Sequence, residues 1–196
     1  MAAFTSGNSV LEVAAPSPNV SGGLWRAPLG TPLPTDTVAA LNAAFVPMGY
    51  VDDSGVVRAE NRPNNKAYAW GGSLVASLQQ SYSVTYTFKF YQVMDPDVLK
   101  AVHSDGNVTV TAATSTVGTL STTALNPTLN VNAAWVISAF YQAAALRIAL
   151  PIARVTQVGS FSLTHKNLAT YDVTLESFPD TSGNFGYQYW NDGQHT

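Results

Sequence analysis

Hydrophobic and polar residues alternate strictly in one stretch of the chain, residues 81–90. Its even positions are aromatic or β-branched, and its odd positions are Ser, Thr or Lys. A period of two places these two sets on opposite faces only in an extended strand. Burial of each apolar side chain is worth about 1.5–3 kcal/mol, so the even face must be covered. The pattern predicts a β-strand with a buried aromatic face and a hydroxyl-rich face open to water.

Helical spacing occurs in two stretches. In residues 95–102, Asp95 is a suitable cap and Pro96 suits the first helical position, while Val98, Leu99 and Val102 form one apolar stripe. The pair Asp105-Gly106 is expected to end this helix. A second, shorter helix is predicted over residues 36–45, with Asp36 as its cap and with apolar residues at helical spacing, namely Val38, Leu41 and Phe45.

Most of the remaining chain has the pattern of strands and connections. Residues 46–60 predict two short strands around a turn at 51–56, and residues 61–66 predict a polar linker. Residues 68–78 predict one strand, bent at Gly71-Gly72 and paired with the alternating strand. Further strands are predicted over 107–114, with Val108, Val110 and Ala112 inward, and over 134–141, 146–152, 155–164 and 171–178, while 120–131 predicts a connection.

The composition limits which partners and which covalent or metal sites the chain can have. Charged residues make up 11% of the 196 residues and the net charge is −3, so the chain has no basic patch that could grip nucleic acid. The low charge fits either a surface that meets copies of itself or a surface made soluble by Ser, Thr and Asn. The chain has no cysteine, which excludes disulfides and thiolate metal sites.

The chain shows neither a signal peptide nor a membrane span. No Lys or Arg precedes Arg26, and the most apolar run, residues 143–153, contains Arg147 and Pro151 and is too short to cross a bilayer. The expected location is therefore a cytosol, without membrane insertion.

Candidate reactive groups do not form a catalytic constellation. His103, Ser104 and Asp105 are adjacent, and adjacent side chains cannot adopt the geometry of a nucleophile and its base. His165 and His195 have no partner at metal-ligand spacing, and the aspartate pairs lack the other ligands of a calcium loop. We expect no catalytic residue, no cofactor and no metal, hence no enzyme.

Several stretches occur in an order that resembles one family. They are residues 22–34 (GGLWRAPLGTPLP), 41–45 (LNAAF), 49–56, 69–72 (AWGG), 81–88 and the late run 151–184. Together they resemble the major tail tube proteins of bacteriophages with long, non-contractile tails, especially those of actinobacterial hosts. The likeness extends over roughly residues 20–190 and depends on the ordered set rather than on one motif.

The resemblance implies a mainly β protein with a β-sandwich or barrel-like tail tube fold, one flanking short helix, a long loop and extended termini. It implies an N-terminal arm at 1–20, a domain at 21–180 with a stacking insertion at 27–66, and a C-terminal arm at 181–196, whose aromatic residues are expected to dock. Family members form hexameric rings that stack into the tail tube of the virion after synthesis in the host cytoplasm. The implied partners are other copies, the tape measure protein, the tail terminator and distal tail proteins, and genomic DNA in transient passage.

Two groups of residues follow as candidates for this role. The polar face of the alternating strand is expected to line the bore, with Ser81, Ser83, Thr85, Thr87 and Lys89. Subunit or ring contacts are expected from Leu24, Trp25, Arg26, Pro28, Leu29, Phe45, Tyr50, Phe185, Tyr187, Tyr189 and Trp190. The alternative hypothesis is a phage β-sandwich module that recognises a surface ligand, with the aromatic tail as its platform.

Overall fold

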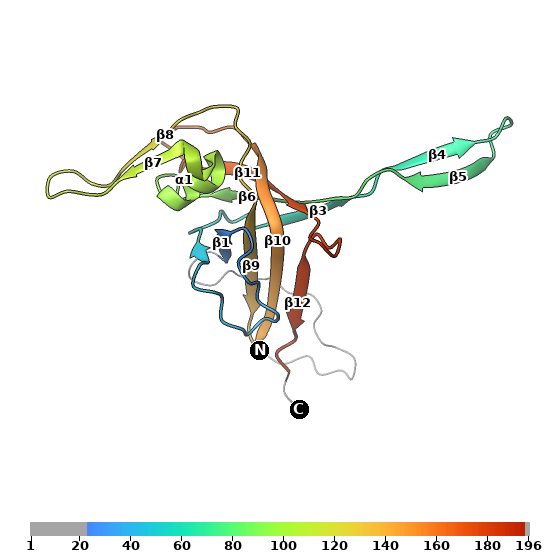
Figure 1. Ribbon diagram of the computed structural model, residues 1–196, viewed down its shortest axis with the longest axis horizontal. Coiled ribbons are helices and arrows are strands. Elements are labelled where there is room, and N and C mark those ends of the chain that lie inside the picture. Colours follow the sequence, from blue (N-terminus) through green and yellow to red (C-terminus); the bar gives the residue numbers. More distant parts are fainter. Residues whose placement is uncertain (1–22, 195–196) are drawn as a thin grey trace.

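The structure is a computed structural model that describes residues 23–194 (Figure 1). The chain is mainly β with one short α-helix, as the sequence predicts. The strands are β1 (Leu24–Pro28), β2 (Val46–Pro47), β3 (Val57–Asn61), β4 (Asn64–Tyr68), β5 (Leu74–Gln79), β6 (Ser83–Phe90), β7 (Val108–Thr111), β8 (Leu120–Thr123), β9 (Ala133–Tyr141), β10 (Ala144–Val158), β11 (Tyr171–Phe178) and β12 (Tyr187–Asn191), and the helix is α1 (Pro96–His103), followed by a 3-10 turn, Asp105–Asn107.

One antiparallel sheet forms the body, in the order β2-β1-β9-β10-β11-β6-β3. Its centre is β10, which pairs with β12 through residues 145–149 and with β11 through residues 152–158 on the same edge. The strands β9, β10 and β12 run crosswise to β6 and β3 (Figure 1). Side chains from both parts and from α1 share one hydrophobic core, so the sheet folds over that core.

Strand β6 has the faces that its alternation predicts. Val84, Tyr86, Phe88 and Phe90 are buried in the main core, whereas the intervening residues are exposed or half-buried. The strand lies inside the sheet, between β11 and β3. Burial raises the pKa of Tyr86 to about 12, which keeps its hydroxyl neutral in the core.

The helix α1 also follows its local signals. The side chain of Asp95 accepts a hydrogen bond from Asp97 N at 2.8 Å, and Pro96 is the first helical residue. Val98 and Val102 are buried against the core. The helix ends at His103, just before the predicted Asp105-Gly106 pair, because Ser104 has a positive φ of 76°.

The helix predicted over residues 36–45 is wrong. The segment is a series of bends, in which Asp36 Oδ1 accepts from the backbone N–H groups of Val38 and Ala39. Arg147 Nη1 donates to the carbonyl oxygens of Asp36 and Ala39, at 3.0 and 2.6 Å. These carbonyl groups therefore bind a distant side chain in place of the N–H groups of a following helical turn.

Residues 61–80 differ most from the sequence prediction. The expected polar linker and the single bent strand are in fact one hairpin, β4–β5, and the Gly71-Gly72 pair is its tip. Both glycines have positive φ, 122° and 86°, which a tight turn requires and a bent strand does not. It is β3, and not residues 68–78, that pairs with β6.

The prediction for residues 107–114 is also wrong in part. Only Val108 of the expected inward set is buried, because β7 pairs with β8 in a second hairpin away from the sheet. The strand β8 lies within the predicted connection 120–131. The two short strands expected in 46–60 form as β2 and β3, but they pair with β1 and β6 instead of with each other.

Two strand predictions near the C-terminus merge into one element. The predicted strands 146–152 and 155–164 merge in the single long β10, whose register shifts relative to β9 and β11 mark irregularities near residues 150–157. The prediction is wrong for residues 159–164, which are exposed and lie beyond the end of β10 at Val158. Residues 187–191 of the predicted C-terminal arm dock as β12 on β10. The predicted N-terminal arm, 1–20, lies outside the described residues. No helix in the described range is long and apolar enough to cross a membrane.

Candidate assembly surfaces

Four of the five residues predicted to line a bore share one face of the sheet, and the fifth, Ser81, lies outside it. Ser83, Thr85, Thr87 and Lys89 lie on β6 opposite its buried face, and Ser81 precedes the strand. Neighbouring strands extend this polar face, since Thr174 of β11 lies opposite Thr87. We call this surface, made of the odd positions of β6, residues 172, 174 and 176 of β11 and Arg154 of β10, the polar face.

Charges on the polar face are balanced across the strands. Lys89 lies opposite Asp172, and Arg154 of β10 lies opposite Glu176. Two cations and two carboxylates thus occupy paired positions, and the remaining polar groups are mainly hydroxyls. The surface has no excess of cations that could hold phosphate groups.

Two of the predicted contact residues belong to the chain's own interior. Leu24 is fully buried in the main core, and Phe45 is buried in a second cluster with Ala27, Val136 and Ala149. Both residues are apolar by type, but only tertiary packing decides which apolar residues face outward. In this conformation neither side chain offers a surface to a partner.

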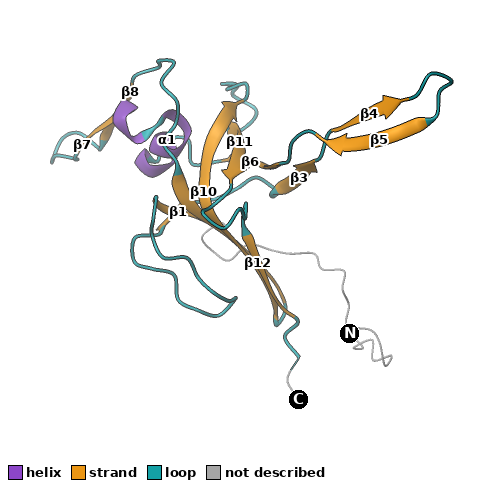
Figure 2. Cartoon of the chain, turned by 45° about the vertical axis from the view of Figure 1, so that its right-hand side comes forward, coloured by secondary structure: helices purple, strands orange, loops and turns teal. Residues whose placement is uncertain are grey.

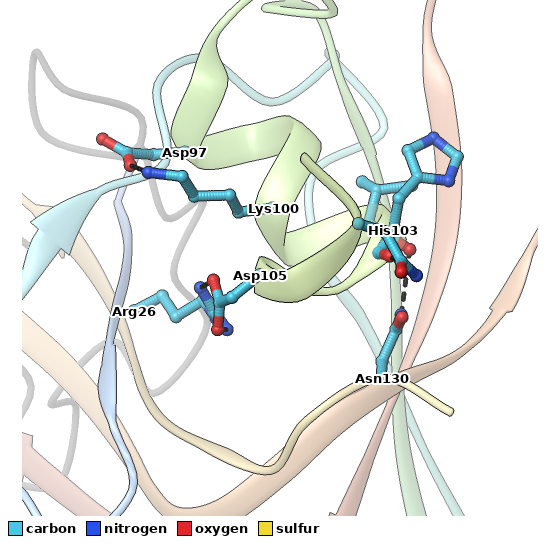
Figure 3. A network of polar contacts seen from close by, with 8 residues as sticks. Arg26, Asp97, Lys100, His103, Asp105 and Asn130 are labelled. Carbon is cyan, nitrogen blue, oxygen red and sulfur yellow. Dashed lines mark hydrogen bonds and ion pairs between the residues drawn. The ribbon is translucent and has the colours of Figure 1, made fainter. Parts of the chain in front are cut away.

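Arg26, Pro28 and Leu29 lie together beside a cleft of about 470 Å³. Arg26 donates two hydrogen bonds to the carboxylate of Asp105, at 2.8 and 2.7 Å, and Lys100 faces Asp97 at 3.6 Å (Figure 3). These paired charges border a cleft whose floor includes apolar side chains, namely Ala27, Leu29, Val46, Met48 and Val131. The surface suits an apolar segment of a partner that brings little charge.

The remaining predicted contact residues differ in exposure. Tyr50 and Trp190 are exposed, while Trp25 and Tyr189 are half-buried against the second cluster. Phe185 packs edge-to-face on Tyr82, with ring centroids 4.9 Å apart. Tyr187 donates a hydrogen bond to Asp180 Oδ2 at 2.6 Å, and this bond lowers the pKa of Asp180 and raises the pKa of Tyr187.

The hairpin β4–β5 is the largest exposed feature that sequence reasoning missed. It projects away from the body on one side (Figures 1 and 2). Residues 61–80 are exposed throughout apart from the half-buried Ala76, and Trp70 at the tip is fully exposed. Large apolar residues on it are Tyr68, Trp70, Leu74, Val75 and Leu78. The glycine pair between two runs of strand-forming residues was the signal that could have identified it.

The described residues contain no group of three or more His, Asp or Glu side chains that could hold a metal ion. His103 lies at the end of α1, where burial lowers its pKa and its ring contacts Tyr171 edge-to-face at 5.5 Å. Neither Ser104 nor Asp105 hydrogen-bonds the imidazole among the bonds of the described chain, so the adjacent trio His103, Ser104 and Asp105 forms no triad.

Comparison with known proteins leaves the fold as the only classification. The structure defines a mainly β protein with two projecting hairpins. The chain matches no protein-family model, and no curated protein matches it significantly.

Proposed function

We propose that this chain is the structural subunit of a bacteriophage tail tube. Copies associate into rings, expected to be hexameric, and the rings stack into the tube of the virion. The bore holds the tape measure protein during assembly and conducts genomic DNA during infection. The ends of the tube meet the tail terminator and distal tail proteins. The proposal grows from the ordered resemblance of residues 20–190, and the exposed hairpin β4–β5 is the structural observation that carries it.

The hairpin supports the proposal because it is unfinished as part of a single chain. Two-stranded hairpins are marginal in water unless they pack against something else. This one exposes five large apolar side chains, and its cations Arg62 and Lys66 are the only charged residues within 61–80. The whole chain has a net charge of −3, so the rest carries −3 − 2 = −5. Arg62 already pairs with Glu60 of its own chain at 3.4 Å, so a second copy offers apolar contacts and an opposite-charge contact for Lys66.

The ends of the main sheet also favour association of identical chains. The strand β3 forms one end, and its outer edge lacks a partner strand within the described sheet. The other end is β2, which has only two residues and includes Pro47. The exposed edge of β3 invites pairing with another chain, and ring closure would cover it, whereas a very short edge strand with a proline, such as β2, resists such pairing.

The polar face is the surface proposed to line the bore. It lies opposite the face of β6 on which α1 packs, since Phe88, Phe90 and Val98 share the main core. A hydroxyl-rich surface with balanced charge offers DNA little electrostatic attraction. In the proposed tube, α1 and the turn before it therefore face outward.

Microscopy of the purified full chain tests the proposal directly. Negative-stain images over a wide range of protein concentration should contain rings or tubes, and sedimentation should show a matching loss of free subunits. A chain that stays a single particle at every concentration, including after co-expression with the other tail proteins, would contradict the proposal.

Single cysteines then test which face lines the bore, because the natural chain has no cysteine. The variant Thr85→Cys places a thiol on the polar face, and the matched control Met94→Cys places one at an exposed position just before α1. In assembled tubes a bulky maleimide should label Cys at 94 and spare Cys at 85, whereas free subunits should react at both. Equal labelling of both in tubes would refute the bore assignment while leaving tube formation intact.

A surface-ligand binding module is the second candidate, and one cleft favours it. The cleft has a volume of about 390 Å³ and is lined by Arg58, Glu60, Tyr82 and Phe185, together with residues near the start of β12. Aromatic rings beside charged groups are a common arrangement in ligand sites. Binding of a cell-surface glycan that is lost in Phe185→Ala, by a chain that never forms rings, would favour this candidate.

A further inference from the structure

Residues 29–45 form a long loop that we call the strap. It lies against the face of the sheet opposite the main core, where Leu33, Leu41 and Phe45 contact a small cluster formed by Ala27, Ala134, Val136 and Ala149. The strap contains no helix or strand, so few of its own backbone groups are paired within it. Contacts with the sheet must therefore determine its position.

Apart from the turn in which Thr31 bonds the carbonyl oxygen of Pro28, one side chain supplies the hydrogen bonds found between the strap and the sheet. Arg147 lies on β10, between Ser138 of β9 and Tyr189 of β12 in the strand register. Its Nε donates to Ser138 Oγ at 3.2 Å, and its Nη1 donates to the carbonyl oxygens of Asp36 and Ala39, at 3.0 and 2.6 Å. The side chain thus links two strands of the sheet to the middle of the strap.

Arg147 is also unusual because it is a charged residue that is buried without an ion pair among the described residues. The residue is only 9% exposed, and none of the ion pairs among residues 23–194 includes it. The nearby carboxylate of Asp36 is turned toward the backbone of Val38 and Ala39. Burial lowers the pKa of Arg147, and the charge of Asp36 opposes this shift without a direct contact.

These observations define two opposing contributions to the free energy of closing the strap over the sheet. Closing the strap buries Leu33, Leu41 and Phe45, which favours the closed state. Closing it also removes a guanidinium group from water, and this cost is offset by hydrogen bonds to uncharged oxygens and by the nearby charge of Asp36, without a direct ion pair. When the strap opens away from the sheet, the guanidinium group of Arg147 becomes hydrated and the small apolar cluster becomes exposed to solvent. The polar contacts are concentrated at residues 36 and 39, so this part of the strap depends most on Arg147.

We propose that Arg147 is the positioning residue of the strap, and that residues 29–45 open locally from the sheet when its two carbonyl contacts are lost. The closed strap fixes where the exposed side chains of Leu29 and Val38 lie. Opening uncovers Ala134, Val136 and Ala149, which together form an apolar surface on β9 and β10. The inference concerns the single folded chain and does not depend on tube formation.

Hydrogen exchange of the full chain tests this inference. In the natural chain, backbone amides of residues 36–45 should exchange faster than amides paired between β9 and β10, but more slowly than those of the exposed loop at 112–118. In Arg147→Met, which keeps the aliphatic bulk and removes the donors, amides of 36–45 should exchange about tenfold faster or more, because hydrogen bonds to a charged group are lost. Amides in the β9–β10 pairing should keep their natural rates.

Two further variants separate positioning from general weakening. Arg147→Lys retains a charged donor and should give intermediate exchange over residues 36–45. Arg154→Met removes another arginine of β10, whose guanidinium lies over the Phe178 ring at 4.8 Å, and should leave the strap unchanged. Unchanged or slower exchange of the strap in Arg147→Met would overturn the proposal, because it would mean that apolar packing alone holds the loop. If Arg147→Met does not fold, the order of exchange rates in the natural chain decides: a strap as protected as β9–β10 would equally overturn it.

Discussion

The two hairpins of this protein have the same architecture but different support. Both β4–β5 and β7–β8 are two-stranded and antiparallel, and they project from opposite sides of the body (Figures 1 and 2). The base of β7–β8 is joined to the body: Val108 is buried, and Asn107 and Asn126 exchange two amide hydrogen bonds, at 3.2 and 2.9 Å. The base of β4–β5 has one backbone bond of its own, from Gln80 N to Pro63 O at 2.8 Å, and one exposed side-chain link to the body, since Arg62 pairs with Glu60 at 3.4 Å and lies over the Tyr82 ring at 4.6 Å. None of its side chains is buried.

The two hairpins also differ in their charged and apolar residues. Residues 61–80 contain two cations and a fully exposed tryptophan, whereas residues 108–123 contain no charged residue and are rich in Ser and Thr. The uncharged hairpin is thus anchored by a buried residue, whereas the apolar, basic hairpin is not. On the proposed function, we expect β7–β8 to contribute to the stability of the subunit and β4–β5 to contribute to association.

Replacing residues 64–79 with a short glycine linker should have the largest effect on association. Because none of the side chains in this range is fully buried, the thermal unfolding of the free subunit should stay close to that of the natural chain. Rings and tubes should disappear entirely from negative-stain images. Replacing residues 109–122 in the same way is the matched control, and it should leave some assembly. Normal tubes without β4–β5 would break the comparison.

Val108→Ala should have the largest effect on subunit stability at the two hairpins. Val108 is 8% exposed and lies where β7 leaves the body, so the loss of two buried methyl groups should lower the free energy of unfolding by about 2 kcal/mol. Urea denaturation followed by circular dichroism measures it. Val110→Ala, on the same strand but 38% exposed, should change stability by less than about 0.5 kcal/mol. Equal effects of the two substitutions would show that the base of β7–β8 is not anchored.

The elements that the sequence predicts well are those with strong local signals. The alternation in β6 and the cap formed by Asp95 and Pro96 each lie within a few residues, and both elements form as expected. The helix expected at 36–45 fails because its carbonyl groups bind Arg147, which is 111 residues away from Asp36 in the sequence. No local pattern contains such a contact.

The residues of the candidate surfaces were likewise predictable only where a local pattern determines their orientation. The polar face of β6 could be derived from alternation alone, because a strand side chain faces one side or the other. The contact residues could not be separated in this way, since Leu24 and Trp190 are both large and apolar but only packing makes the first buried and the second exposed. The hairpin β4–β5 escaped prediction because it has no buried face, and burial patterns are what reveal strands.

Asn126→Ala should weaken the anchored hairpin by a smaller amount. The substitution removes both amide hydrogen bonds to Asn107, whose side chain keeps its bond to the carbonyl oxygen of His103 at 2.8 Å. Because the pair is partly exposed and water can replace the lost partner, the expected loss is about 1 kcal/mol in the free energy of unfolding. Asn61→Ala, at the end of β3 beside the other hairpin, is the control and should be neutral. A neutral result for Asn126→Ala would place the support of β7–β8 in Val108 alone.

The smallest expected effect is a pH dependence confined to the base of β7–β8. Burial lowers the pKa of His103 below its ordinary value of 6.5, so the unfolded chain binds a proton more readily than the folded chain. The contribution of neutral His103 to stability is therefore complete above pH 6.5, and is lost as the pH falls through 6.5 toward the folded pKa.

Thermal unfolding across this range should show a shallow decline in the natural chain, and His103→Gln should flatten it. Residues 61–80 contain no histidine, aspartate or glutamate, so hydrogen exchange corrected for intrinsic rates should show the local change near residues 103–126 and none over 64–79. A change of equal size at both hairpins would mean that acid weakens the chain as a whole, and that His103 is not its cause.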